Sequence, residues 1–262
     1  MPGVFKYKLG INEFSSNGSN LLKSLLAEFI GVFLLNLFGI FSCLHGTATM
    51  ISFTFGLVVF MVVSSLGHVS GGHINPAVTA GLLSVGKISF ARAILYVISQ
   101  CAGAVAGTAC LKALVPEAQQ GGLGITKVAE NVLPMQGLGL EFFLGFVLVL
   151  TVFGVVDDNK PDSKYLAPLA IGMTVTFGHL AGIKYTGASM NPARTFGSAV
   201  ISGIWENHWI YWVGPILGGV AAALLYVQAF IAPEPEVDLA ERYRTHADEK
   251  EMARLDGKRD LA

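Results

Sequence analysis

Long apolar runs separated by short polar segments make up most of this 262-residue chain. Six of the runs are close to the ~20 residues that an α-helix needs to cross the ~30 Å hydrocarbon layer of a membrane. They cover residues 21–44, 49–67, 90–114, 137–156, 165–183 and 208–231. Two further apolar segments, 75–85 and 191–202, are much shorter. At 1.5 Å per residue each reaches only ~16 Å, so we expect both to enter the membrane halfway.

Composition places the chain among membrane proteins with several spans. Hydrophobic residues make up 53% of it and charged residues 13%, whereas about a quarter of an ordinary soluble domain is charged. The mean hydropathy is +0.59. A net charge of −1 and the absence of a basic stripe give no case for a nucleic-acid partner. The predicted fold class is an all-α membrane protein with six transmembrane helices and two re-entrant half-helices.

One short motif begins both half-length segments. Its two copies consist of Asn75, Pro76 and Ala77, and of Asn191, Pro192 and Ala193. Asn is a favoured N-cap, and Pro is favoured at the first helical position, where its missing N–H has no consequence. A single copy predicts only the start of a helix. Two copies at matching places, 116 residues apart, indicate a duplicated functional element.

The repeat extends beyond this motif. Glu28 near the start of the first half and Glu141 near the start of the second are 113 residues apart, each followed by Phe. Three spans per half is an odd number, so the second half is expected to insert upside down. Inverted repeats of this kind place the functional site in broken helices near the membrane midplane. The predicted regions are an N-terminal arm (1–20), a channel domain (21–231, with repeats 21–114 and 137–231 and linker 115–136) and a charged tail (232–262).

Positive charge predicts the orientation of the chain. Of the 17 Lys and Arg residues, 13 lie in four segments that the topology puts on one side: 1–23, 86–92, 157–164 and the tail from 232. Without the tail the count is seven against four. Positive residues favour the cytoplasmic side. We therefore expect both termini to be cytoplasmic and the linker to lie outside.

The duplicated motif within six apolar runs resembles the aquaporin (major intrinsic protein) family, over residues of roughly 20 to 231. The resemblance implies a passive water channel of the cell membrane that excludes ions and protons. It also implies a homotetramer with one pore per subunit. The sequence offers no Ser/His/Asp or Cys/His set, phosphate loop or metal cluster, so we expect no cofactor and no enzymatic activity. Two alternatives are a channel for small neutral solutes such as glycerol, urea or peroxide, and a non-conducting adhesion or scaffold protein of the same fold.

The resemblance implies a narrow ring near the outer mouth. In the family, this aromatic/arginine filter is formed by the positions that match Phe55, His179, Ala188 and Arg194. Arg194 stands out by itself, since a buried Arg in a membrane segment is costly and normally faces a water-filled path. We expect Arg194 and His179 to present donors and the two aromatic side chains to set the width. Many water-selective members have Cys in place of Ala188, so this ring is slightly enlarged.

Further positions favour water over glycerol. Glycerol-conducting relatives usually carry Asp where this chain has Thr195, Gly in place of His179, a Pro-Leu-like pair in place of residues 211–212, and Lys in place of Ala199. All four differences point to a water-selective member.

The two motif Asn residues and the buried acids have separate expected roles. Each Asn is expected to cap its half-helix through the side-chain oxygen, which leaves an NH₂ group with two donors. The NH₂ groups of the two Asn residues could then both donate to the oxygen of one central water molecule. The positive ends of the half-helices oppose cations, as in aquaporin-type selectivity. Glu28, Glu141 and His73 resemble the residues that support the loops before the half-helices. We favour this role over proton relay or metal binding.

Three glycine pairs are spaced for close helix crossings: Gly103/Gly107, Gly178/Gly182 and Gly214/Gly218.

Overall fold

The computed structural model describes residues 9–10 and 18–234. Its contacts divide the chain into one unit from Met1 to Ile231 and a second from Ala232 to Ala262. The predicted N-terminal arm and charged tail fall largely outside the described residues. The first unit contains all the elements that follow.

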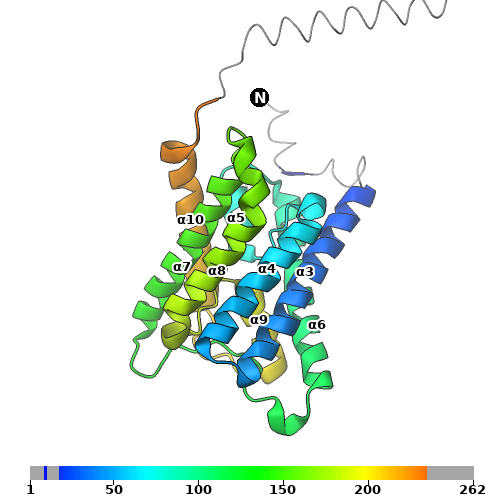
Figure 1. Ribbon diagram of the computed structural model, residues 1–262, viewed down its shortest axis with the longest axis vertical. Helices are drawn as coiled ribbons and strands as arrows, with labels where there is room; N and C mark the ends of the chain where they lie inside the picture. Colours follow the sequence, from blue (N-terminus) through cyan, green and yellow to red (C-terminus); the bar gives the residue numbers. More distant parts are fainter. Residues whose placement is uncertain (1–8, 11–17, 235–262) are drawn as a thin grey trace, which may run out of the picture. The chain divides into compact units, whose positions relative to one another are not determined.

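Within the described residues, six helices are long and apolar enough to cross a membrane, which confirms the prediction of six spans. Their main elements are α3 (Gly18–His45), α4 (Ala48–Ser70), α6 (Phe90–Leu114), α7 (Pro134–Val155), α8 (Ala167–Thr186) and α10 (Ile210–Leu225). The fifth span begins at Pro161 and the sixth ends at Phe230. A short π-helix, Tyr226–Phe230, continues α10, and two 3-10 helices lie at Glu117–Gln119 and Pro161–Leu166. The start of α3 and the end of α10 lie at the same end of the bundle (Figure 1).

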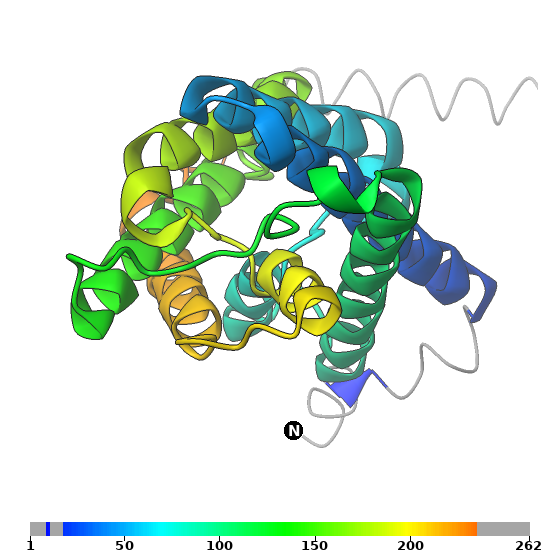
Figure 2. The same ribbon diagram turned by 90° about the horizontal axis from the view of Figure 1, so that it is seen from below.

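The two half-length segments form α5 (Pro76–Ser84) and α9 (Pro192–Ser202). They have nine and eleven residues, which is too short to cross a bilayer. In Figure 1, α5 lies toward one end of the bundle and α9 toward the other. Seen from below, the half-helices lie between α6 and α10 (Figure 2), and α9 packs on α6 while α5 packs on α10.

Glycine permits the closest helix contacts. A Cβ at Gly107 of α6 would overlap the Phe33 carbonyl of α3, and a Cβ at Gly218 of α10 would overlap the Phe142 carbonyl of α7. Their partners Gly103 and Gly214 lie against the same two helices. The third predicted pair is different. Gly178 and Gly182 of α8 face Leu144 of α7 together with Met190 and Ala188 of the loop before α9.

Two left-handed glycines end the helices that lead into the half-helix loops. Gly71 ends α4 with φ 91°, and Gly187 ends α8 with φ 79°. Residues with a side chain rarely adopt this conformation. The chain therefore turns sharply into the bundle at equivalent places in the two halves.

Candidate functional site

The half-helix N-termini carry the cap that the sequence predicts. The Asn75 side-chain oxygen accepts the backbone N–H of Ala77 at 2.8 Å. The Asn191 oxygen accepts the N–H groups of Ala193 at 3.0 Å and Arg194 at 3.3 Å. The side-chain oxygen of each Asn thus accepts backbone N–H groups at the positive end of its half-helix, and the side-chain nitrogen remains free for other partners.

The Asn amides also bond across the repeat. Asn75 donates through Nδ2 to the Met190 carbonyl, and Asn191 donates through Nδ2 to the Ile74 carbonyl, both at 2.8 Å. An amide nitrogen has two N–H groups, so each Asn keeps one donor. One N–H of each Asn is therefore left for a central water molecule, and the bond of the other N–H to the opposite half was not predicted from the sequence.

The acceptors of these bonds have unusual backbone conformations. Ile74 has φ 43° and Met190 has φ 56°. A β-branched residue such as Ile is rare in this left-handed region. Each residue turns its carbonyl toward the Asn of the opposite half, so the strain serves the junction between the two loops.

Glu28 accepts four hydrogen bonds that fix the first loop. Its Oε1 accepts from the Ser70 hydroxyl at 2.7 Å and the His73 N–H at 3.0 Å. Its Oε2 accepts from the Ile74 N–H at 2.6 Å and the Gln100 amide at 2.7 Å. A fully buried carboxylate needs such donors.

Glu141 does the same for the second loop. Its Oε1 accepts from the Thr186 hydroxyl at 2.6 Å and the Ser189 N–H at 2.9 Å, and its Oε2 accepts from the Met190 N–H at 2.9 Å. The two carboxylates therefore hold equivalent backbone groups just before the two motif Asn residues.

Two buried tyrosines belong to the same arrangement, and this loop-supporting role was not predicted from the sequence. The Tyr96 hydroxyl donates to the Ser70 carbonyl at 2.8 Å, and the Tyr211 hydroxyl donates to the Thr186 carbonyl at 2.9 Å. The tyrosines are 115 residues apart. This separation is close to the 116 residues between the two motifs, and the repeat could therefore have predicted the pair.

His73 lies between the first loop and its half-helix. Its Nδ1 is 3.1 Å from the Thr79 hydroxyl of α5, and its ring packs edge-on against Tyr96 at 5.0 Å. Among the described residues, no group of three or more His, Cys, Asp or Glu side chains is placed to hold a metal ion.

Three of the four predicted filter residues come together. The rings of Phe55 and His179 stack with centroids 4.5 Å apart, and the Arg194 guanidinium carbon lies 5.0 Å from the Phe55 centroid. Arg194 Nη1 also donates to the Gly124 carbonyl in the linker. These groups come from α4, α8 and α9, which only the tertiary fold brings together.

Ala188 has a different environment from the other three. It is fully buried with φ 49°, and its methyl lies 3.2 Å from the position that a Cβ at Gly182 would take. Ala188 does not line the cavity described next. Its backbone N–H donates to the Thr186 hydroxyl at 3.1 Å.

A cavity of about 370 Å³ connects the candidate filter with both motifs. Phe55, His179, Arg194, Asn75 and Asn191 all line this cavity, and most of its other lining residues are apolar. Lys87 and Arg92 are the other charged side chains that line it. The cavity is thus an apolar passage with a few fixed polar groups, as ligand passages generally are.

Two buried polar atoms at the candidate filter have no protein partner among the described residues: His179 Nε2 and Arg194 Nε. The His179 Nδ1 donates to the Val175 carbonyl at 3.0 Å. In the neutral ring Nε2 is then an acceptor, so His179 presents an acceptor where a donor was expected. Unpaired buried groups are costly unless water or a ligand satisfies them.

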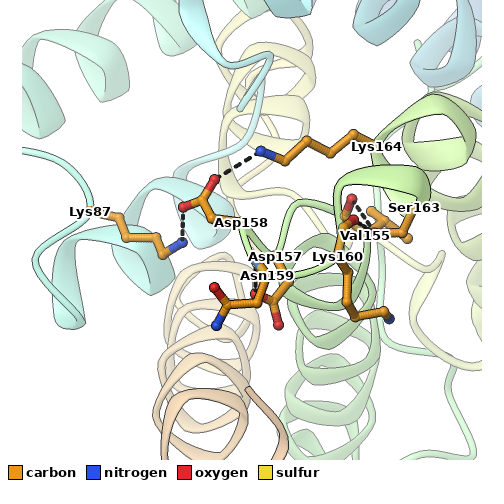
Figure 3. A network of polar contacts seen from close by, with 8 residues as sticks. All are labelled: Lys87, Val155, Asp157, Asp158, Asn159, Lys160, Ser163 and Lys164. Carbon is orange, nitrogen blue, oxygen red and sulfur yellow. Dashed lines mark hydrogen bonds and ion pairs between the residues drawn. The ribbon is translucent and has the colours of Figure 1, made fainter. Parts of the chain in front are cut away.

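An ion-pair network lies between the end of α5 and the segment that joins α7 to α8 (Figure 3). Asp158 lies 3.6 Å from the Lys87 ammonium and 2.8 Å from that of Lys164. The Lys164 hydrogen bond and the charges of Lys87 and Lys164 hold the pKa of Asp158 below its usual range. Because the Asp158 side chain is 77% exposed, solvent screens these pairs and their contribution to stability is small.

Comparison with known proteins identifies the family. The sequence profile of the major intrinsic protein family matches residues 15–226. The chain belongs to the major intrinsic protein family. As a member of this channel family it is not an enzyme, which confirms the prediction from the sequence.

Individual relatives of this family member are aquaporins. The chain is 44% identical over 231 residues to mouse aquaporin-4, which covers 85% of the chain and 71% of that protein. It is 40% identical to bovine aquaporin-2, over 84% of the chain and 82% of that protein. The solved structure of the aquaglyceroporin from Plasmodium falciparum matches with a TM-score of 0.73 at 23% identity, over 80% of the chain and 96% of that structure. The last match confirms the fold.

Proposed function

We propose that this family member is a passive water channel that excludes glycerol, ions and protons. The observation that carries the proposal is the tight cluster of Phe55, His179 and Arg194 in the lining of the cavity. We propose that the opening bounded by these two rings and the guanidinium admits water and is too narrow for glycerol. The named aquaporin relatives support the same conclusion.

The wider region supports discrimination against glycerol. Thr195 stands where glycerol-conducting relatives usually carry Asp, and its hydroxyl lies 2.6 Å from that of Ser189 and 3.0 Å from that of Thr126. Tyr211 is bonded to the loop before α9. These hydroxyls are thus already hydrogen-bonded within the protein.

Cation exclusion follows from fixed positive groups. A cation would meet Arg194 and then the positive ends of α5 and α9. The single remaining N–H of each motif Asn would bind the oxygen of one water molecule. The water's hydrogens would then point along the path in opposite directions and interrupt a chain of proton transfer.

Stopped-flow measurements on vesicles that contain the purified protein test this proposal. We expect fast water flow, glycerol flow close to that of empty vesicles, and no change in internal pH under a proton gradient. Glycerol flow as fast as water flow would favour the neutral-solute channel. A folded protein that adds no water flow would favour the non-conducting scaffold.

The proposal also includes the membrane location and the oligomeric state of the channel. Large apolar side chains are exposed on the outer helix surfaces: Leu22, Leu26, Phe41, Phe143 and Phe177. Such a surface fits lipid and neighbouring copies of the chain. We place the channel in the cell membrane as a homotetramer with a pore in each subunit.

A further inference from the structure

One face of α3 lies directly behind the candidate filter. Asn36, Gly39, Ile40 and Cys43 follow the i, i+3, i+4, i+7 spacing of a single helix face. We call these four residues the α3 face. None of the four was predicted to take part in the site.

Each residue of the α3 face contacts a different part of the filter. Asn36 Nδ2 donates to the Arg194 carbonyl at 3.2 Å. The thiol of Cys43 interacts with the Arg194 guanidinium. Ile40 packs against Gly124, whose carbonyl accepts the Arg194 Nη1 bond: a Cβ at Gly124 would lie 2.8 Å from Ile40 Cγ2.

Gly39 makes room for the aromatic wall. A Cβ at Gly39 would lie 2.7 Å from Cζ and 2.8 Å from Cδ1 of Phe55. Real Cβ atoms do not approach other atoms so closely, so any side chain at Gly39 would displace the ring. Because Phe55 also lines the cavity, we expect a displaced ring to enter the path.

Asn36 is energetically unfavourable at this position. It is fully buried in a membrane helix, and its Oδ1 has no partner among the described residues. Its Nδ2 lies near three acceptors: Ala104 O at 3.2 Å, Thr108 Oγ1 at 3.0 Å and Arg194 O at 3.2 Å. A buried unpaired amide oxygen destabilises a fold, and an apolar residue would avoid that cost.

The other half of the protein shows that packing does not require the amide. The residue 113 positions after Asn36 is Val149. Val149 packs against Gly81 of α5. A Cβ at Gly81 would lie 2.9 Å from Val149 Cγ1 and 3.1 Å from the Gly219 carbonyl oxygen. Asn36 packs in the same way against Gly197 of α9. The half that contains Arg194 is the one that carries the amide.

We propose that Asn36 and Gly39 are positioning residues of the filter. Asn36 fixes the main chain of Arg194, and Gly39 sets how far the Phe55 ring enters the path. The α3 face thereby determines the width of a ring to which it contributes no lining side chain. This inference rests on the proposed water-channel function.

The first test compares Asn36→Val with Thr108→Val in vesicles that contain the full chain. Thr108→Val removes an acceptor of Asn36 on α6 and leaves the bond to Arg194. We expect Asn36→Val to raise the glycerol-to-water permeability ratio about two- to tenfold, the effect of one lost hydrogen bond. Thr108→Val should leave the ratio unchanged. An unchanged ratio in Asn36→Val, or equal shifts in both variants, overturns the role of Asn36.

The second test uses Gly39→Ala and probes the other contact of the α3 face, independently of whether Asn36→Val folds. The added methyl should reduce water flow per channel, and Phe55→Leu in the same chain should restore it. Gly139→Ala is the control, since a Cβ at Gly139 of α7 would meet no atom within 4 Å. Normal flow in Gly39→Ala, or no recovery in the double variant, overturns the proposal. If the proposed water-channel function itself were wrong, the unmodified protein would pass no water. That result is distinct from a failure of the inference about Asn36 and Gly39.

Discussion

Single carboxamides do several tasks at the centre of this protein. Asn191 caps α9, bonds the backbone of the opposite half and keeps one N–H for the path. Asn75 does the same for α5. No other uncharged side chain combines a fixed acceptor with two donors, Gln excepted, and the longer Gln does not cap as well.

His179→Gly should admit glycerol. The substitution removes the ring that stacks on Phe55, while Arg194 and the Asn pair stay in place. We expect glycerol permeability to rise about tenfold or more, since even one missing methylene can change discrimination by that factor. Stopped-flow light scattering gives the value, with water flow as the control for folded protein. Continued exclusion of glycerol in a conducting variant would contradict the filter assignment.

Asn191→Asp should weaken the barrier to cations. A carboxylate can still accept the N–H groups of α9, but it cannot donate to the Ile74 carbonyl, and it adds a negative charge beside the path. We expect reduced water flow together with a measurable cation current under voltage clamp. Steady currents through the unmodified protein would refute the exclusion mechanism altogether.

At the scale of elements, two short loops decide where the half-helices stand. Each loop is held by one buried carboxylate and one buried tyrosine at equivalent positions. The loops contain few residues, so their shape depends on these side chains and not on a ladder of backbone bonds. Their stability should therefore be sensitive to the carboxylates.

Glu28→Gln and Glu141→Gln should destabilise the fold. Gln would turn an NH₂ group toward donors that now face a carboxylate, and bonds to a charged group are worth about 1.5–3 kcal/mol each. We expect the melting temperature in detergent to fall by about 5 °C or more. Glu28→Gln should lower the melting temperature more than Glu141→Gln, because Glu28 also accepts a hydrogen bond from Gln100. Normal stability with altered proton flux would favour a relay instead.

The turn before α10 should be sensitive to acid. Trp212 Nε1 donates to His208 Nε2 at 3.1 Å, which requires a neutral acceptor, and burial lowers the pKa of His208 from 6.5. The unfolded chain therefore takes up a proton before the folded chain does. The contribution of His208 to stability is full above pH 6.5 and decreases as the pH falls through its lower folded pKa.

Melting temperatures at about pH 7.5 and about pH 5.5 measure this effect. His208→Gln is the control, because its side-chain oxygen can still accept from Trp212 and does not titrate. We expect a smaller acid-induced decrease in this variant. Equal decreases would assign the pH dependence to other groups.

At the scale of the whole molecule, the inverted repeat determines topology. Each half contributes three spans and one half-helix, so the halves insert in opposite directions and their half-helices meet. The start of α3 and the end of α10 then lie at one end of the bundle (Figure 1). Charge predicts that this end is cytoplasmic.

Epitope tags test that orientation. A tag inserted after Gly121, where a Cβ would meet no atom within 4 Å, should stain intact cells. A tag after Ala262 should stain only permeabilised cells. The reverse pattern would show that the chain inserts with the opposite orientation.

The sequence by itself determined the elements and much of the site. Hydrophobic run length distinguished six spans from two half-helices, because the width of the bilayer imposes those lengths. The repeat at a nearly constant offset identified both Asn residues and both carboxylates. These signals are local or periodic, so they are visible in a linear chain.

Only the tertiary structure decided which partners these residues choose. It showed that each Asn gives one donor to the opposite loop, that His179 turns its acceptor away from the helix backbone, and that Ala188 does not line the cavity. It also placed Asn36 behind Arg194, which is 158 residues away along the chain. Such contacts depend on how helices cross and how side chains share donors in a closed space, and no spacing along the sequence encodes that geometry.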